Sequence, residues 1–360
     1  MDKKILKKLA DTLKNYPLEK DIYIMEVCGT HTVEFFKTGV RFIFPEKLYL
    51  VDGPGCPVCV TPNEYLDRAI EIGKKYKPII TTFGDMIKVP SSYSSFREEK
   101  AKGMDIRVVY SPFDALKIAE ENPDKEVVFL SVGFETTAPG EAMAVLKAKK
   151  KGIKNFSILC GNKLTVPAVE ALLNSGEVNI DGFILPGHVS TVIGVKPWRV
   201  IPEKYNKPCV IAGFEPQDLL MGTLMLLNLI TEDKNEKILN EYKRSVAEEG
   251  NQKALEIMYE VFEKCDSKWR GLGIIPESGL RLKKEYEEFD AEKKFPVEPP
   301  PPKEPKGCKC GEILKGIALP PDCPLFGKVC TQKHPVGPCM VSSEGPCAAY
   351  YIYFLQSPRI

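Results

Sequence analysis

The sequence predicts an α/β protein in which two parallel-sheet domains precede a cysteine-rich C-terminal region. Eight short apolar runs are typical of buried strands, at residues 22–27, 48–51, 78–82, 106–110, 126–132, 156–160, 182–185 and 208–212. Helical stretches separate most of them, at residues 63–75, 112–121, 140–150 and 167–174. Strands that alternate with helices favour parallel sheets covered on both faces.

The number of strands suggests two α/β domains rather than one, divided near residues 133–141. We expect the first domain over residues 21–135 and the second over residues 136–230. The tripeptide Gly-Phe-Glu follows a predicted strand in each, at residues 133–135 and 213–215. Residues 217–293 are charged and helical in pattern, and the proline-rich residues 296–305 predict an extended spacer. An amphipathic helix at residues 1–20 is grouped with residues 231–360 as a third domain.

Composition excludes several classes of function. The 360 residues include 50 Lys and Arg and 49 Asp and Glu, a net charge of +1. This balance predicts no nucleic-acid partner and no binding to an anionic membrane surface. No apolar stretch approaches the roughly 18 residues of a membrane span, so we expect a soluble, cytoplasmic protein. The twelve cysteines then favour metal binding or redox chemistry over a disulfide framework.

Three cysteines lie directly after predicted strands, in loops rich in glycine, proline and threonine. Cys56 and Cys59 form a CxxC pair in Gly53-Pro-Gly-Cys-Pro-Val-Cys, and Cys28 begins Cys-Gly-Thr-His-Thr. Two thiols at this spacing can close a disulfide, share a metal or exchange electrons. We interpret the trio as a soft-metal or redox site, with Cys28 as a thiolate ligand and the pair as a dithiol.

A second set of cysteines crowds the C-terminus, at Cys308, Cys310, Cys323, Cys330, Cys339 and Cys347. Zinc sites usually contain tight CxxC pairs, which this region lacks. Widely spaced thiols beside proline or glycine instead favour a [4Fe–4S] cluster wrapped by loops. Spacing alone does not choose four ligands among the six, although an adjacent proline favours Cys323 and Cys347.

Other polar residues also follow predicted strands, where open parallel sheets bind ligands. His31 and His188 are two of only three histidines and are candidates for proton donation or for a hydrogen bond behind a ligand. Glu135 and Asp85 are candidate acid–base or positioning carboxylates. The sequence contains neither a Walker-type loop nor GxGxxG, so nucleotide binding is not supported.

Together these motifs resemble the HypD family of [NiFe]-hydrogenase maturation proteins. The matching segments are Cys28-Gly-Thr-His-Thr, Gly53-Pro-Gly-Cys56-Pro-Val-Cys59, Gly133-Phe-Glu-Thr-Thr-Ala-Pro, Pro186-Gly-His188-Val, Trp269-Arg-Gly-Leu-Gly, Asp322-Cys-Pro-Leu-Phe-Gly-Lys-Val-Cys330 and Ser342-Ser-Glu-Gly-Pro-Cys347-Ala-Ala-Tyr-Tyr. The resemblance implies two Rossmann-like parallel-sheet α/β domains facing a cleft, plus a C-terminal helical and loop iron–sulfur domain. It also implies a scaffold that holds a mononuclear iron while two cyanides and one carbon monoxide are added, giving Fe(CN)2CO.

Site residues and partners follow from the same resemblance. Cys28 would ligate the iron with His31 beside it, and Cys56 with Cys59 would be redox-active. The family's cluster pattern, Cys-x12-Cys-x6-Cys-x16-Cys, falls on Cys310, Cys323, Cys330 and Cys347, and leaves Cys308 and Cys339 spare. The implied partners are HypC, which shares the iron, and HypE, which delivers cyanide made with HypF.

Two other classes of function stay open on the sequence. A cluster-dependent disulfide reductase would use the CxxC pair on a disulfide substrate, with Cys28 as a resolving thiol, and would carry no mononuclear iron. A structural zinc protein would contain zinc and lack the brown colour of an iron–sulfur cluster.

Overall fold

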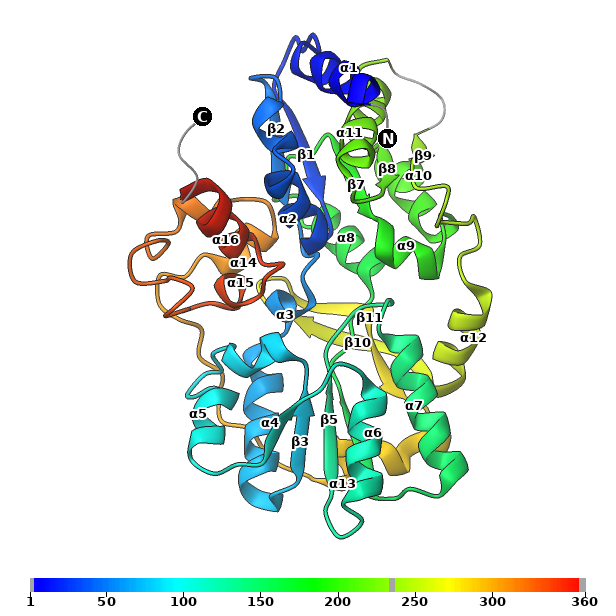
Figure 1. The fold of residues 1–360 in the computed structure, drawn as a ribbon, viewed down its shortest axis with the longest axis vertical. Helices are drawn as coiled ribbons and strands as arrows, with labels where there is room; N and C mark the ends of the chain where they lie inside the picture. The colour runs from blue at the N-terminus through cyan, green and yellow to red at the C-terminus, as the bar shows by residue number, and fades with distance from the viewer. Residues whose placement is uncertain (1–2, 233–236, 356–360) are drawn as a thin grey trace.

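Two α/β lobes are stacked along the long axis of the molecule, and the cysteine-rich C-terminal segment lies beside them (Figure 1). This computed structural model describes residues 3–232 and 237–355. Residues 1–2 of the predicted N-terminal helix, and residues 233–236 and 356–360 of the predicted third domain, lie outside the described part. The predicted fold class is confirmed: both sheets are parallel α/β sheets, and the C-terminal region is helical with long loops.

The upper lobe in Figure 1 contains a five-stranded sheet in the order β2-β1-β7-β8-β9. Its strands are β1 (Ile22–Glu26), β2 (Leu48–Asp52), β7 (Gly182–Pro186), β8 (Cys209–Ala212) and β9 (Ile238–Asn240). One face packs against α1 (Lys3–Lys14), α2 (Gly29–Lys37) and α11 (Pro216–Thr231). The other face packs against α8 (Thr165–Asn174), α9 (Gly187–Ile193) and α10 (Val200–Tyr205).

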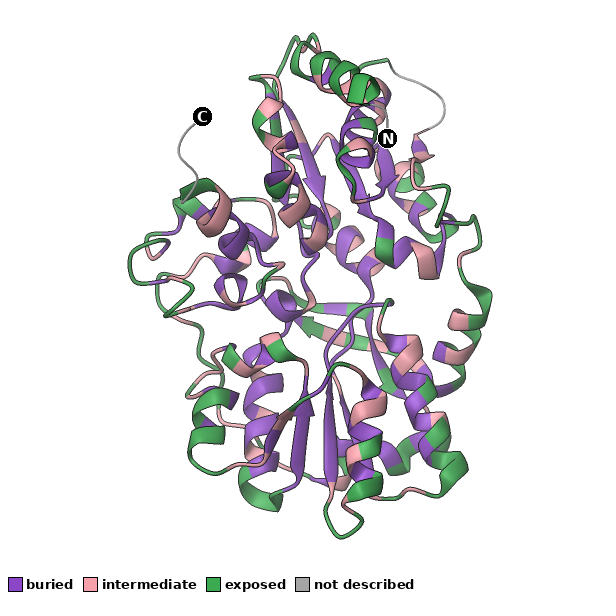
Figure 2. Cartoon of the chain, in the orientation of Figure 1, coloured by how far each residue is buried: buried purple, intermediate pink, exposed green. Residues whose placement is uncertain are grey.

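The lower lobe contains a four-stranded sheet in the order β4-β3-β5-β6. Its strands are β3 (Ile79–Thr82), β4 (Ile106–Val108), β5 (Val127–Ser131) and β6 (Phe156–Cys160). Helices α4 (Asn63–Tyr76) and α5 (Phe96–Ala101) lie on one side, and α6 (Pro112–Glu121), α7 (Ala138–Lys151) and α12 (Gln252–Val261) on the other. The central strands β5 and β7 are buried at every residue, which explains why each reads as a continuous apolar run (Figure 2).

The predicted domain boundary between residues 135 and 136 is wrong. It would separate β5 from β6, which pair in parallel over their whole length. It would also assign β1 and β7 to different domains, although they are neighbours in one sheet. The chain leaves the upper lobe after β2, builds the whole lower sheet, and returns through α8. Local apolar runs locate strands, but pairing between distant segments decides which lobe each strand joins.

The predicted third domain, residues 231–360 with the N-terminal helix, is also divided differently. Strand β9 joins the upper sheet, and α1 buries Leu13 in the upper core. The helical pattern expected up to residue 293 is interrupted by an antiparallel hairpin, β10 (Phe262–Trp269) and β11 (Gly273–Leu282), which lies between the lobes (Figure 1). Burial alternates along β10, so its charged residues face outward. In the sequence, this charged pattern resembles that of a solvent-exposed helix.

The remaining helices are short: α3 (Pro57–Val60), α13 (Ala291–Lys294), α14 (Cys310–Leu314), α15 (Pro338–Val341) and α16 (Pro346–Ala349). Between α13 and α14 the predicted proline spacer runs without helix or strand along α4 and its neighbours. Tyr76 and Tyr93 donate their hydroxyls to the carbonyls of Pro296 and Pro301 at 3.0 and 2.8 Å. The spacer therefore carries the chain across the lower lobe to the cysteine-rich segment.

Candidate functional site

Cys28 lies at the carboxyl end of β1, in the turn that starts α2. Its backbone N–H donates to Glu26 Oε2 at 2.7 Å, and Gly29 N–H donates to the Gly55 carbonyl at 3.1 Å. A Cβ built on Gly55 would lie 2.2 Å from the Cys28 nitrogen. Only glycine permits this approach, so the loop that precedes Cys56 lies directly against the Cys28 loop.

The predicted CxxC pair is joined in a disulfide, Cys56–Cys59, with Cα atoms 5.2 Å apart. Cys56 precedes the single turn of α3, and its sulfur accepts the N–H of Cys59 at 3.2 Å. Both residues are buried. One helical turn thus holds the two sulfurs on the same face, beside the loop of Cys28.

Two buried carboxylates, which the sequence reading did not identify, lie directly behind these cysteines. Glu26 and Asp52 end the neighbouring strands β1 and β2 and are partners in their register. Thr32 donates its hydroxyl to Glu26, whereas neither oxygen of Asp52 has a hydrogen-bond partner among the described residues. Burial, followed by the charge of Asp52, raises the pKa of Glu26 well above its usual value. The sequence signal that could have identified Glu26 and Asp52 is an acidic residue at the end of each of two predicted apolar runs.

The electrostatics of this pocket disfavour a free thiolate at Cys28. Burial raises the pKa of the thiol to about 12, and the carboxylates of Glu344 and Glu26 act in the same direction. A thiolate here therefore requires a positive charge beside it, because an opposite charge favours the ionised form. A bound metal cation would supply that charge.

The two predicted histidines lie on one aromatic ring. His31 and His188 pack against Phe214 with ring centroids 4.7 and 3.9 Å apart, respectively. His31 Nε2–H donates to the carbonyls of Ala212 and Gly213, at 3.2 and 2.9 Å. Burial lowers the pKa of His31 to about 4, so its ring is neutral. Its Nδ1 is buried and has no partner among the described residues, which leaves a lone pair in the site.

The C-terminal segment bridges the two lobes at this point. Thr30, in the Cys28 loop, donates its hydroxyl to Glu344 Oε1 at 2.6 Å. On the other side, Asp85 Oδ2 accepts from Ser342 Oγ at 3.2 Å and from Ser343 N–H at 3.3 Å. Asp85 therefore anchors this segment, and Glu344 enters the site although the sequence reading did not select it. Its place in the Ser-Ser-Glu-Gly-Pro-Cys motif was the available signal.

Glu135 is in a different environment from the other candidates. Its Oε1 accepts the Thr165 N–H at 2.8 Å, at the start of α8, and burial raises its pKa to about 7. Among the described residues, no hydrogen bond joins Glu135 to the cysteine loops. The structure thus gives Glu135 a helix-capping contact rather than a place beside Cys28.

The C-terminal cysteines gather around one hollow. All six line it: Cys308, Cys310, Cys323, Cys330, Cys339 and Cys347. Cys310 and Cys339 are joined in a disulfide with Cα atoms 6.4 Å apart. The free thiols at the hollow are therefore Cys308, Cys323, Cys330 and Cys347. The set that the family resemblance implied contains Cys310 in place of Cys308, whereas in the structure α14 brings Cys310 to Cys339 on α15.

The chemistry of the four free thiols fits an iron–sulfur cluster. Soft thiolates on loops are the usual ligands of such clusters. Within the described residues no three His, Cys, Asp or Glu side chains converge as a single metal ion requires. A cuboidal cluster instead binds each thiolate at a different iron, so it needs thiols arranged around a hollow. The free space here is about 10 Å³, room for one water, so the thiols would have to rotate outward to admit a cluster.

Comparison with known proteins identifies close relatives over nearly the whole chain. The family described as "HypD: Hydrogenase formation hypA family" matches residues 1–354. The chain is 46% identical over 354 residues to the hydrogenase expression/formation protein HupD of Azotobacter chroococcum, covering 96% of this chain and 92% of that protein. It is 43% identical over 345 residues to the hydrogenase maturation factor HypD of Escherichia coli, covering 95% and 92%. No helix in the described part of the chain has the length and hydrophobicity needed to span a membrane.

Proposed function

Because the chain belongs to the HypD family, we propose that it acts in hydrogenase maturation, as the scaffold on which an Fe(CN)2CO unit is assembled. The observation that supports this most is the direct contact between the Cys28 loop and the loop of the Cys56–Cys59 disulfide. A metal-binding thiol and a two-electron thiol couple at adjoining loops can act on the same iron.

Cys28 is the proposed iron ligand. Its raised pKa means that binding ferrous iron releases the thiol proton and gives an iron–thiolate bond, whose cation offsets the nearby carboxylates. The neutral His31 would lie beside the iron in this proposal, and the Ala212 and Gly213 carbonyls fix the orientation of its ring. Its Nδ1 lone pair is free to accept a hydrogen bond from a group brought to the iron.

Cys308, Cys323, Cys330 and Cys347 are the proposed holders of a resident [4Fe–4S] cluster, which when bound supplies electrons one at a time. Reduction of the Cys56–Cys59 disulfide consumes two electrons and two protons and yields two thiols. The pair can therefore store what two single-electron transfers deliver. The Cys310–Cys339 disulfide lines the same hollow as the four thiols and is a second thiol couple in the chain.

The proposed partners are HypC, which would share the iron, and HypE, which would deliver cyanide made with HypF, all in the cytoplasm. The support is that the relatives of this chain are named as hydrogenase maturation factors. Glu344 and Thr30 are hydrogen-bonded to each other beside Cys28. An iron-sharing partner that approaches Cys28 would have to fit against these two side chains.

Anaerobic purification with metal analysis and infrared spectroscopy tests this proposal, with and without coexpressed HypC and HypE. We expect about four irons per chain plus one more, with cyanide and carbonyl stretches that vanish in Cys28→Ala. Cys265→Ser is the matched control, because this half-buried thiol lies in the hairpin and should leave the bands unchanged. Bands that persist in Cys28→Ala would refute the assigned ligand, and cyanide attachment at full rate in Cys56→Ala would refute the redox role.

The second candidate function is an iron–sulfur-dependent disulfide reductase. The two disulfides, one beside Cys28 and one at the cysteine hollow, favour it. A chain with about four irons and no cyanide or carbonyl bands, even with both partners present, would support the reductase over the scaffold.

A further inference from the structure

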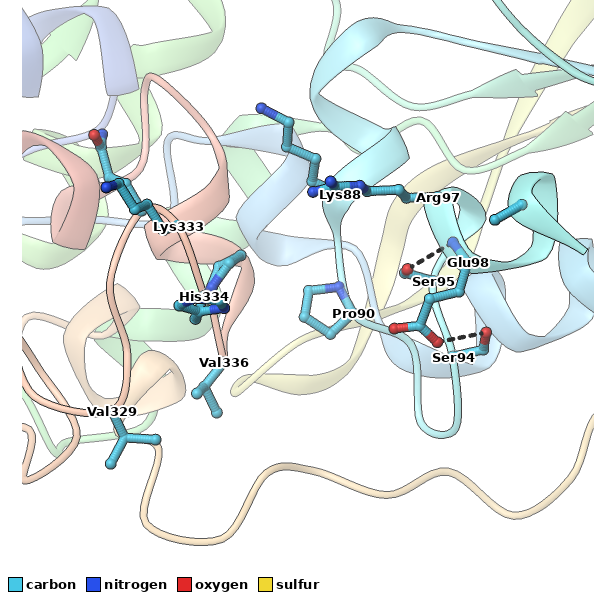
Figure 3. Close-up of a pocket in the computed structure, with 13 residues that line it drawn as sticks. Lys88, Pro90, Ser94, Ser95, Arg97, Glu98, Val329, Lys333, His334 and Val336 are labelled. Atoms are coloured by element: carbon cyan, nitrogen blue, oxygen red, sulfur yellow. Dashed lines mark hydrogen bonds between the residues drawn. The ribbon is translucent and has the colours of Figure 1, made fainter.

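A cationic pocket of about 850 Å³ lies between the lower lobe and the loop that follows Cys330 (Figure 3). Lys88 and Arg97 line it from the lower lobe, and Lys333 and His334 line it from the loop. Lys88, Arg97 and Lys333 are exposed, and none of them forms an ion pair among the described residues. Glu98 is the one acidic residue of the lining. The three cations therefore outnumber it and leave a local positive charge on a chain whose net charge is only +1.

The pocket adjoins the cysteine hollow. Val336 lines the pocket, and its backbone N–H donates to Cys330 Sγ at 3.3 Å. Cys330 itself lines the hollow. One loop therefore has the pocket on one side and a proposed cluster ligand on the other. Val329, directly before Cys330, is 63% exposed and adds an apolar contact surface to the same wall.

Several other polar groups of the pocket are already engaged in hydrogen bonds. Ser95 Oγ accepts the Glu98 N–H at 3.2 Å, and Ser94 Oγ donates to the Glu98 carboxylate at 3.1 Å. The backbone N–H of His334 donates to the Thr331 carbonyl at 3.1 Å. The backbone N–H groups of Glu98 and His334 are engaged in these contacts, so a small phosphate would be held by the exposed Lys88, Arg97 and Lys333 side chains alone. Long cationic side chains around an apolar patch instead suit the carboxylates of a protein surface.

We propose that this pocket docks a small acidic electron-carrier protein, which reduces the cluster proposed at Cys308, Cys323, Cys330 and Cys347. The inference rests on the proposed function. In each encounter the reduced carrier would give up one electron to the group that these four cysteines would hold, and no bond would be made or broken. Two encounters, with two protons from solvent, match the reduction of one disulfide to two thiols. Docking is transient and steered by charge, as is usual for small redox interfaces.

The test measures association of the full-length, anaerobically purified protein with a small acidic ferredoxin as probe. The charge-reversed variant is Lys88→Glu/Arg97→Glu/Lys333→Glu. The control makes the same change of net charge at exposed lysines of α1, α7 and α12: Lys7→Glu/Lys150→Glu/Lys253→Glu. At low salt we expect the pocket variant to associate about 10-fold more slowly than wild type or worse, and the control less than about 2-fold. Salt should remove the difference, because it screens exposed charges.

Three outcomes would overturn the proposal. The first is a pocket variant that associates at the wild-type rate. The second is an equal loss in pocket and control variants, which would mean that only net charge matters. The third is saturable binding of ATP or inorganic phosphate that the pocket variant abolishes while ferredoxin association is unchanged.

Chemical reduction distinguishes failure of the docking proposal from failure of the proposed function. Dithionite needs no docking site, so the cluster of the pocket variant should be reduced by dithionite as in wild type, and slowly by ferredoxin. A wild-type protein that contains no reducible cluster would refute the proposed function, and the association rates would still decide whether the pocket docks an acidic protein.

Discussion

Replacing Gly55 with alanine tests whether contact between the two cysteine loops holds the site together. The new Cβ would lie 2.2 Å from the Cys28 nitrogen and 2.4 Å from the Val27 carbonyl carbon, whereas ordinary contacts begin near 3.4 Å. These are backbone atoms, so the loop has to retreat by about 1 Å, which breaks the Gly29–Gly55 hydrogen bond. Overpacking costs about 1–3 kcal/mol and the lost bond about 1 kcal/mol, so we expect a destabilisation of about 2–4 kcal/mol.

The assay is thermal unfolding of the oxidised protein, together with alkylation of Cys28, which is 7% exposed in the structure. Gly55→Ala should melt earlier and expose Cys28 to alkylation. Gly140→Ala, in helix α7, is the control, because a Cβ built on Gly140 would lie 4.0 Å from its nearest neighbour atom. That change should stabilise by about 0.5–1 kcal/mol. A Gly55→Ala protein that melts at the wild-type temperature and keeps Cys28 protected from alkylation would refute the reasoning.

Three further predictions concern the groups around the site. The buried Arg270 binds Thr61, Asn63 and the 60% exposed Glu304, so Arg270→Lys should lower the melting temperature markedly, at a cost of about 2–4 kcal/mol. Glu304→Gln should cost less than about 1 kcal/mol; equal effects would contradict this. Burial raises the pKa of Glu135 from 4.5 to about 7, so between these pH values the folded state holds a proton that the unfolded state has released, and stability falls as pH rises. The melting temperature of Glu135→Gln should therefore rise relative to that of wild type between about pH 5 and about pH 8. A difference in melting temperature that stays constant over this range would exclude this titration. Asp85→Ala removes the acceptor for Ser342 and Ser343 and should speed amide exchange in residues 342–345, whereas unchanged exchange would show that this anchor is dispensable.

Most elements of the two sheets could be predicted because their signals are local. All eight predicted strands exist, and their bounds differ from the predictions by at most two residues at either end. Parallel strands covered on both faces read as short apolar runs, and helices read as amphipathic or apolar stretches between them. The hairpin β10–β11 was missed because alternating charged residues give the same composition as a solvated helix.

The candidate site was predictable in its chemistry and only partly in its membership. The loops of Cys28, Cys56 and His31 stood out because thiols and imidazoles follow strands there. Glu344 reaches Thr30 from 314 positions away along the chain. The Ser-Ser-Glu-Gly-Pro-Cys motif marks the segment of Glu344, but it does not indicate which distant residue this side chain contacts.

By itself the sequence determined the α/β class, the eight strands β1 to β8, and the two sets of cysteines. Only the tertiary structure decided that β1 and β2 join β7 and β8 in one sheet, that Glu26 and Asp52 share one buried edge, and that Cys310 bonds Cys339. The physical reason is the range of the forces involved. Periodicity and turn chemistry act over a few residues, whereas strand order and disulfide choice depend on which distant surfaces bury each other.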